Sequence, residues 1–467
     1  MNTFLNHWKS DKLKTALDIS WLLTVFSCFF GSSVLVVKIP HIPALYPFRV
    51  LVPLTAVLYL AWAIREKRNP WKMGTFLQRM SYVLCAILLV YSTLSLRWAV
   101  DISFSSPIWI TLCFDLVFFA LSLELCSDRK LFSRTVKCSV GALLIQFLMG
   151  IWEVFRGGIF SSRYNHIFVW FGQYYTSPAV TTGNPNDYAM VLVFTLGLVL
   201  LYWAWEGHKE KYNWIPVALA AVAYFLIYST LGRLCTLSFW ILMAAFALRL
   251  LVSEKQVRRL LVLLAVLMGI VIGVTAYGDH YTQQMNSQRP ENQIVRETEP
   301  ALKDEIFTVD EETGETQLNL ALSGGIRVEL LIRAGECFVR SKGMGVGVGN
   351  TAQYAKLDAD RRGGVWGIHC FLARMSADFG IWFLIPMLLI AFKMVQEGAA
   401  YTLREMKKRN WQGAATGVLY LAAVLIYPIT STASGDAQNS LPMWLFMGII
   451  VLFPAFMRET KETLGGE

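Results

Sequence analysis

The strongest constraint on the fold is the grouping of apolar residues into blocks of about 20, the length that a helix needs to cross about 30 Å of hydrocarbon. Of the 467 residues, 55% are hydrophobic and 16% are charged, whereas soluble proteins carry about 25% charged residues. The sequence therefore predicts an all-α polytopic membrane protein. We expect about twelve transmembrane helices, at residues 16–37, 45–64, 80–98, 107–126, 135–155, 187–205, 214–230, 232–251, 259–277, 368–392, 413–430 and 440–457.

Lysine and arginine residues near the ends of these spans predict the orientation. They gather in alternate connections, at 65–72, 129–137, 209–211, 249–259 and 404–409. Because cytoplasmic loops are enriched in Lys and Arg, we expect these connections and both termini to be cytoplasmic. The net charge of +9 follows largely from this topology and gives no reason to expect a nucleic-acid partner.

Two long connections then lie on the outer side. Residues 156–186 are rich in aromatic residues and end in a turn that contains Asn184 and Pro185. Residues 278–367 form a large extracytoplasmic loop between spans 9 and 10, with a hairpin over 305–320 and an amphipathic helix at about 325–340, lying on the outer membrane face. The chain thus divides into residues 1–277 with spans 1–9, the loop 278–367, and residues 368–467 with spans 10–12 and a cytoplasmic tail.

Three polar residues stand out on the outer side. On the loop helix, Glu329–Arg333 and Glu336–Arg340 have the spacing of local ion pairs, whereas Arg327 has no such neighbour. Arg233 lies in a very short turn between two apolar spans, and His369 opens the following span. Each has a simpler interpretation: the arginines reach lipid phosphates, and the histidine is a polar boundary residue. Together they suit a phosphate ester and an attacking hydroxyl group.

The run GMGVGVGN at 343–350 is glycine-rich but follows no predicted strand, so the context of a dinucleotide-binding loop is missing. We interpret Gly345, Gly347 and Gly349 as a structural turn that ends the loop helix. Asp358 and Asp360 either bind a divalent metal or are neutralised by the adjacent Arg361 and Arg362, and we expect no metal site.

The eight cysteines show no metal-ligand spacing. Cys337 and Cys370 are both predicted to be external, and they are either small buried residues or a disulfide pair.

This combination of motifs resembles the bacterial O-antigen ligase and O-antigen polymerase superfamily, which includes capsule, exopolysaccharide and teichuronic acid polymerases. The shared features are an arginine-bearing loop helix, a GxGxGN turn, a histidine that opens the next span, GNPNDYA before a span, and a short S-x-x-G-R turn, all within about 135–395. The family usually has Asn after that histidine, whereas this chain has Cys370.

The resemblance implies a GT-C-type membrane glycosyltransferase of the bacterial cytoplasmic membrane, with its active site at the outer face. It implies a glycan on undecaprenyl diphosphate as donor, a glycan hydroxyl as acceptor, membrane lipid around the site, and no cofactor. Chain-length regulator and flippase proteins are further implied partners. Arg233 and Arg327 correspond to the arginines that hold the diphosphate, and His369 to the residue that orients or deprotonates the acceptor. Arg163 is a further candidate for phosphate contact.

Three functional alternatives remain open from the sequence. A polymerase joins lipid-linked repeat units, and an O-antigen-type ligase transfers the glycan to a lipid or protein acceptor; we favour polymerase, with inversion at the anomeric carbon. A flippase or transporter suits the number of spans, but residues 1–230 and 231–467 show no internal repeat of the kind many transporters have. A non-catalytic scaffold gives no reason for the cluster of arginine and histidine.

Overall fold

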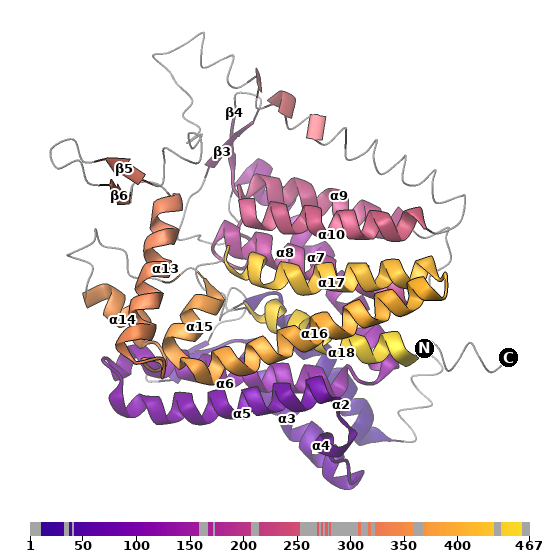
Figure 1. The fold of residues 1–467 in the computed structure, drawn as a ribbon, viewed down its shortest axis with the longest axis horizontal. Helices are drawn as coiled ribbons and strands as arrows, with labels where there is room; N and C mark the ends of the chain where they lie inside the picture. Colours follow the sequence, from indigo (N-terminus) through magenta and orange to yellow (C-terminus); the bar gives the residue numbers. More distant parts are fainter. Residues whose placement is uncertain are drawn as a thin grey trace.

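The computed structural model consists mainly of long helices, many of which run side by side (Figure 1). It describes residues 11–31, 37–39, 42–157, 167–170, 173–206, 214–252, 269, 272–273, 276–278, 280–281, 307–309, 316–318, 323–357, 368, 370–433 and 440–459. Within these ranges the regular structure is helical apart from three two-stranded sheets.

The helices of the first half of the chain are α2 (Lys12–Cys28), α3 (Pro47–Arg65), α4 (Pro70–Met73), α5 (Phe76–Ser95), η2 (Leu96–Trp98), α6 (Ile102–Leu125), α7 (Arg129–Arg156), α8 (Pro185–Glu206), α9 (Trp214–Ser229) and α10 (Arg233–Leu251). Those of the second half are α13 (Ser323–Arg340), α14 (Asn350–Leu357), α15 (Phe371–Phe379), α16 (Ile381–Lys407), α17 (Trp411–Ser431) and α18 (Leu441–Glu459).

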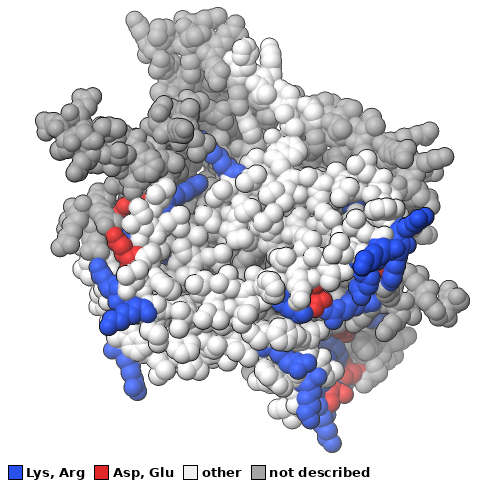
Figure 2. All heavy atoms as spheres, in the orientation of Figure 1, with Lys and Arg blue, Asp and Glu red and all other residues white. Residues whose placement is uncertain are grey.

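Nine helices in the described part of the chain are long and apolar enough to cross a membrane, which confirms a multi-pass membrane protein. These spans are Pro47–Arg65, Phe76–Trp98, Ile102–Leu125, Arg129–Arg156, Pro185–Glu206, Arg233–Leu251, Ile381–Lys407, Trp411–Ser431 and Leu441–Arg458. Figure 2 agrees, because Lys and Arg side chains gather toward opposite edges of the visible face and leave a broad uncharged band between them.

The expectation of twelve spans is corrected at the first and the seventh. The seventh, helix α9, has 16 residues and falls short of the length of the nine. The ninth predicted span, 259–277, lies mostly outside the described residues. Helix α2 ends at Cys28 instead of continuing to residue 37. Gly31, with φ of 50°, follows it, and strand β1 (Val37–Ile39) lies beyond, where a run of β-branched residues before a proline favours extended structure.

The predicted span 368–392 is also divided. Helix α15 ends at Phe379, Gly380 has φ of 60°, and α16 begins afresh at Ile381. The amide N–H of Ile381 donates to the carbonyl of Gly343 at 2.8 Å, so a contact with a distant part of the chain fixes the break. The tenth predicted span therefore starts about a dozen residues later than expected and runs on to Lys407.

Two helices form the centre of the bundle. The most apolar stretches of α8 and α18 are 89% buried, whereas those of α3 and α5 are 33% and 28% buried. A helix that is apolar all round belongs in such an interior. The outer helices expose Val57, Leu60 and Ile64 on α3 and Leu388, Leu389 and Phe392 on α16, the surface expected to meet lipid.

The three sheets are short antiparallel hairpins. Strand β1 pairs with β2 (Ile42–Leu45), β3 (Ile167–Trp170) with β4 (Gln173–Thr176), and β5 (Phe307–Val309) with β6 (Thr316–Leu318). The β5–β6 pair matches the hairpin predicted over 305–320. The β3–β4 pair puts a hairpin into the aromatic connection 156–186.

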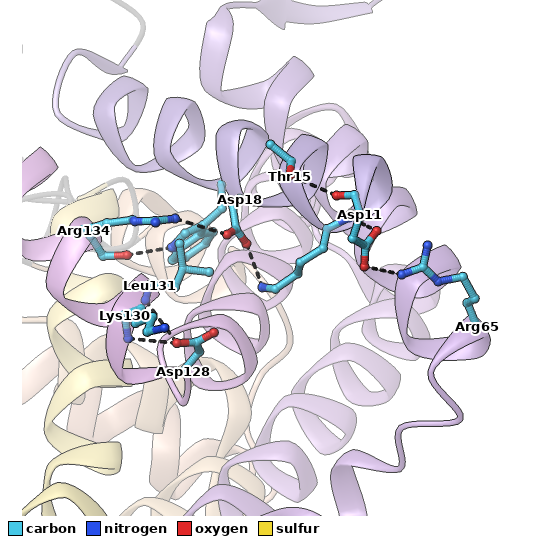
Figure 3. Close-up of polar contacts among 11 residues, drawn as sticks. Asp11, Thr15, Asp18, Arg65, Asp128, Lys130, Leu131 and Arg134 are labelled. Atoms are coloured by element: carbon cyan, nitrogen blue, oxygen red, sulfur yellow. Dashed lines mark hydrogen bonds and ion pairs between the residues drawn. The ribbon is translucent and has the colours of Figure 1, made fainter. Parts of the chain in front are cut away.

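Ion pairs hold α2, α3 and α7 together at the end of the bundle that contains Asp11 (Figure 3). Asp11 caps the first turn of α2 and accepts a hydrogen bond from Arg65 at the end of α3. Asp18 accepts from Lys14 Nζ at 2.7 Å and lies 3.5 Å from Arg134 Nη1 on α7. This is the end that the sequence predicts to be cytoplasmic, and its cations are tied to carboxylates.

Candidate functional site

Helix α13 covers nearly the range expected for the loop helix, and it buries two of its charged residues. Glu329 and Arg333 are 4% and 2% exposed, and Glu329 Oε1 lies 2.8 Å from Arg333 Nε. Arg333 Nη1 also donates to the carbonyl of Ala355 in α14 at 2.6 Å. The predicted Glu329–Arg333 pair is thus confirmed, and it fastens α13 to α14.

The opposite face of α13 is apolar and exposed. Leu331, Ile332 and Val339 are 45%, 41% and 74% exposed, and they fall on one stripe of the helix. A helix that buries an ion pair and exposes aliphatic side chains is inverted relative to a helix on a water-soluble protein. Its outer face is therefore suited to an apolar environment.

Arg327 lies near the start of α13 and is partly exposed. Its charge acts on the thiol of Cys235, which lies in the first turn of α10, and the carboxylate of Asp187 in α8 acts on the same thiol. Arg327 therefore lies within electrostatic range of the first turn of α10, as Asp187 does, although 140 residues of sequence separate Arg327 from Asp187.

Arg233 is the first residue of α10, two positions before Cys235, and its side chain is exposed. The preceding turn is tight, with Leu231 at φ of 60°. A Cβ atom on Gly232 would lie 3.5 Å from Asn186 Oδ1 and 3.4 Å from Ala189 Cβ. The turn therefore packs on the start of α8, and Arg233 borders the same region as Arg327 and Asp187.

The start of α8 is built by the GNPND segment. Gly183 has φ of 70°, and Asn184 Oδ1 accepts from the amide of Asn186 at 2.9 Å. Pro185 is the first helical residue, where its missing N–H costs nothing. Asp187 lies in the first turn, where the helix dipole favours a negative charge. Asn184 thus ends a turn and Pro185 begins α8.

The glycine-rich run forms a turn wedged between α5 and α15. Gly345, Gly347 and Gly349 have φ of 89°, 104° and 75°. A Cβ atom on Gly345 would lie 2.5 Å from the carbonyl carbon of Phe379, so only glycine fits there. The amides of Val346 and Gly347 donate to the carbonyls of Ala377 and Asp378, at 2.9 and 2.8 Å.

Asp378 is the polar centre of this turn. It is fully buried and accepts from the amides of Gly349 and Thr351, at 3.2 and 3.1 Å, and from the Thr351 hydroxyl at 2.5 Å. Burial raises the pKa of Asp378, while Arg374 and these donors oppose the rise. Asn350 completes the turn, because its side chain joins Val346 to Trp98 and Val100. These amide donors of the turn are therefore hydrogen-bonded to other groups of the protein.

His369, Arg163, Asp358 and Asp360 lie outside the described residues. The two neighbours of His369 are described. Ile368 is 3% exposed and packs in a cluster with Leu330 and Ala334 of α13, and Cys370 Sγ lies 3.5 Å from Thr432 Oγ1 at the end of α17. The chain is therefore held between α13 and α17 on either side of position 369.

All eight cysteines are described and none forms a disulfide, so Cys337 and Cys370 are not paired. Cys337 is instead a small buried residue on α13, 4% exposed. Within the described ranges, no group of three or more His, Cys, Asp or Glu side chains could hold a metal ion.

Sequence reasoning did not select two of the acidic residues found here. Asp187 had a signal, since it follows Asn-Pro-Asn at the start of an apolar helix. Asp378 had none, because its hydrogen-bond donors lie 27 and 29 residues earlier in the chain.

No protein-family profile matches the sequence. The chain is similar to the teichuronic acid biosynthesis protein TuaE of Bacillus subtilis (strain 168), with 26% identity over 140 residues. The match covers 29% of this chain and 28% of that protein, so the chain spans little more than a quarter of the relative's length. The chain is a multi-pass membrane protein with distant, partial similarity to a protein of teichuronic acid biosynthesis.

Proposed function

We propose that this protein is an inverting membrane glycosyltransferase that polymerises lipid-linked oligosaccharide repeat units into a cell-surface polysaccharide. The observation that carries the proposal is that the turn before Arg233 packs on the start of α8, with Arg327 and Asp187 both within electrostatic range of Cys235. The partial similarity to a teichuronic acid biosynthesis protein supports the same class of product. The proposed donor is a glycan on undecaprenyl diphosphate.

The electrostatics favour a diphosphate at this place. The helices α8 and α10 both begin here, and helix N-termini attract anions. The two guanidinium groups add positive charge and hydrogen-bond donors whose spacing matches the oxygens of a phosphate. In the proposed reaction Arg233 and Arg327 stabilise the charge that develops on the leaving diphosphate. Arg163 is proposed as a further phosphate contact.

His369 is proposed as the group that accepts the proton of the acceptor hydroxyl. The acceptor oxygen forms a bond to the anomeric carbon while the bond from that carbon to the diphosphate oxygen breaks. The proton goes to the imidazole and undecaprenyl diphosphate leaves, so the configuration inverts. The packing of Ile368, the preceding residue, in a cluster with Leu330 and Ala334 of α13 supports this proposal.

The apolar stripe of α13 supports an active site at the membrane surface. We propose that Leu331, Ile332 and Val339 lie in the outer leaflet of the bacterial cytoplasmic membrane, which would keep Arg327 at the level of lipid phosphates. In this topology both termini are cytoplasmic, as the positive-inside rule predicts.

The test is turnover of synthetic undecaprenyl diphosphate oligosaccharide by purified protein, with products separated as a ladder on a gel. Arg327→Gln removes the proposed phosphate contact and is expected to abolish the ladder. Arg340→Gln is the matched control on the same helix, because the Arg340 guanidinium lies 4.8 Å from the centre of the Tyr354 ring. His369→Ala is expected to abolish the ladder as well, and thermal melting checks that each variant is folded.

The outcomes separate the alternatives. A ladder lost in Arg327→Gln and His369→Ala but kept in Arg340→Gln supports the polymerase. A single product on an added lipid or protein acceptor, without a ladder, assigns a ligase. If no acceptor supports turnover but the protein moves the lipid-linked glycan between leaflets of a vesicle, it is a flippase and the proposal is wrong.

A further inference from the structure

A cavity of about 330 Å³ lies between α5, α16 and α18, away from the proposed active site. It adjoins the first residues of α5 and the last turn of α18, and α5 follows α4 and the end of α3. It is therefore at the end of the bundle that carries the Asp11–Arg65 contact, which the sequence predicts to be cytoplasmic. Its volume falls in the range of small-molecule sites.

Three ionisable side chains line one part of the cavity. Glu397 Oε1 lies 3.2 Å from Lys393 Nζ, and Glu397 Oε2 also contacts Arg458. The Lys393 and Arg458 side chains remain 31% and 53% exposed. Two cations share one carboxylate, so the group keeps a net charge of +1, which one phosphodiester would neutralise.

Apart from Thr75, the rest of the lining is apolar and includes Phe76, Leu77 and Pro454. Phe76 is 56% exposed, so the cavity reaches the outer surface of the bundle. Lys393 and Glu397 both lie within the long apolar helix α16, where ionisable residues generally mark a functional position. A charged pocket with an apolar wall on the lipid-facing surface fits an amphiphile better than a free ion.

We propose that this cavity binds the phosphate of an anionic phospholipid headgroup from the adjacent leaflet. The guanidinium of Arg458 and the ammonium of Lys393 contact the phosphodiester, and the first part of an acyl chain lies along Phe76 and Leu77. The bound lipid bridges α5, α16 and α18. This site is independent of the sugar chemistry proposed above and does not use Arg233, Arg327 or His369.

The test is native mass spectrometry of delipidated protein with added phosphatidylglycerol or with phosphatidylcholine of the same acyl chains. We expect phosphatidylglycerol to bind preferentially, and Lys393→Gln/Arg458→Gln to weaken its binding about tenfold or more. The control Lys12→Gln/Lys72→Gln removes two cations from elsewhere at the same end and is expected to bind like the wild type. Equal binding of the two lipids, or equal binding by the double variant and the wild type, would overturn the proposal.

Two further arms keep the test decisive. Glu397→Gln keeps both cations and removes the competing carboxylate, so it is expected to bind phosphatidylglycerol more tightly; unchanged or weaker binding argues against a phosphate at this place. Soluble glycerol phosphate is the probe for a free ligand. If it displaces the lipid at equimolar concentration, the cavity is a site for a soluble phosphate and the lipid assignment is wrong.

Discussion

The glycine-rich turn and the region at the starts of α8 and α10 use their polar groups differently. In the turn, Asp378 accepts hydrogen bonds from Gly349 and Thr351, and each of these contacts is internal to the protein. At the starts of α8 and α10, Arg233 is exposed, and Arg327, within electrostatic range of Cys235, is partly exposed. The polar groups of the turn hold the backbone in one conformation, whereas the arginines of the second region expose positive charge.

This difference shows that the most conspicuous motif in a sequence can be structural. GMGVGVGN attracts attention as a nucleotide loop, but its amides are directed at Ala377 and Asp378. The two arginines come from segments without a glycine-rich motif, and folding puts both near Cys235. The comparison predicts that changes in the turn reduce stability and changes at the arginines reduce activity.

Gly345→Ala tests the structural side and should have the largest effect. Its Cβ atom would lie 2.5 Å from the backbone of Phe379 at a φ of 89°, so we expect a loss of about 4 kcal/mol. The measurement is the thermal midpoint and the yield of monodisperse protein in detergent. Gly157→Ala is the control, since Gly157 has φ of 92° with nothing within 4 Å of the added Cβ. Equal losses in the two variants would show that the contact with α15 is unimportant.

Arg233→Gln tests the charged side. We expect polymer formation to fall about 100-fold, the cost of removing one well-placed charge-stabilising donor, while the melting temperature stays close to that of wild type. Arg249→Gln is the matched control at the other end of α10, where Arg249 Nε donates to Thr416 at 3.2 Å. If Arg233→Gln lost activity and stability together, Arg233 would have a structural role and the proposed phosphate contact would be wrong.

Asp378→Asn should have a smaller effect on stability. Gly349 and Thr351 donate to different carboxylate oxygens, so an amide keeps the acceptor for one of them and turns an NH₂ group toward the other. We therefore expect a loss of about 2 kcal/mol. Asp101→Asn, at the exposed start of α6, should be nearly neutral because Asn caps helices as well as Asp does. The measurement is the melting temperature of both variants. Loss of activity at unchanged stability in Asp378→Asn would instead indicate that Asp378 takes part in the reaction.

The smallest predicted effect is a pH dependence at the opposite end of the bundle. The hydrogen bond from Arg65 lowers the pKa of Asp11. A carboxyl whose pKa is lower in the folded protein stabilises the fold above its unfolded pKa of about 4 and loses that contribution as pH falls through the folded value. The melting temperature of Asp11→Asn should therefore fall less than that of wild type between pH 5 and pH 3. A steeper fall in the variant would contradict the assignment.

The helical membrane fold could be predicted from the sequence because each spanning helix satisfies its own backbone and leaves a continuous apolar block. The C-terminal end of α2 and the start of α16 could not be predicted from the sequence. They depend on Gly31 and on the contact between Ile381 and Gly343. Arg233 and Arg327 could be selected as candidate site residues, because ionisable residues at a membrane boundary generally mark a functional position. The proximity of both arginines to Asp187 depends on tertiary structure and has no local signal.

The close contact between the glycine turn and Gly380 also determines the position of α13. A Cβ atom on Gly380 would lie 2.2 Å from the carbonyl oxygen of Gly343, so the backbone at the C-terminal end of α13 is in direct contact with the start of α16. Arg327 lies 13 residues before Arg340, about 20 Å along the helix. Because Glu329 and Arg333 also fasten α13 to α14, the helix is a rigid spacer that sets the distance between this contact and the arginine.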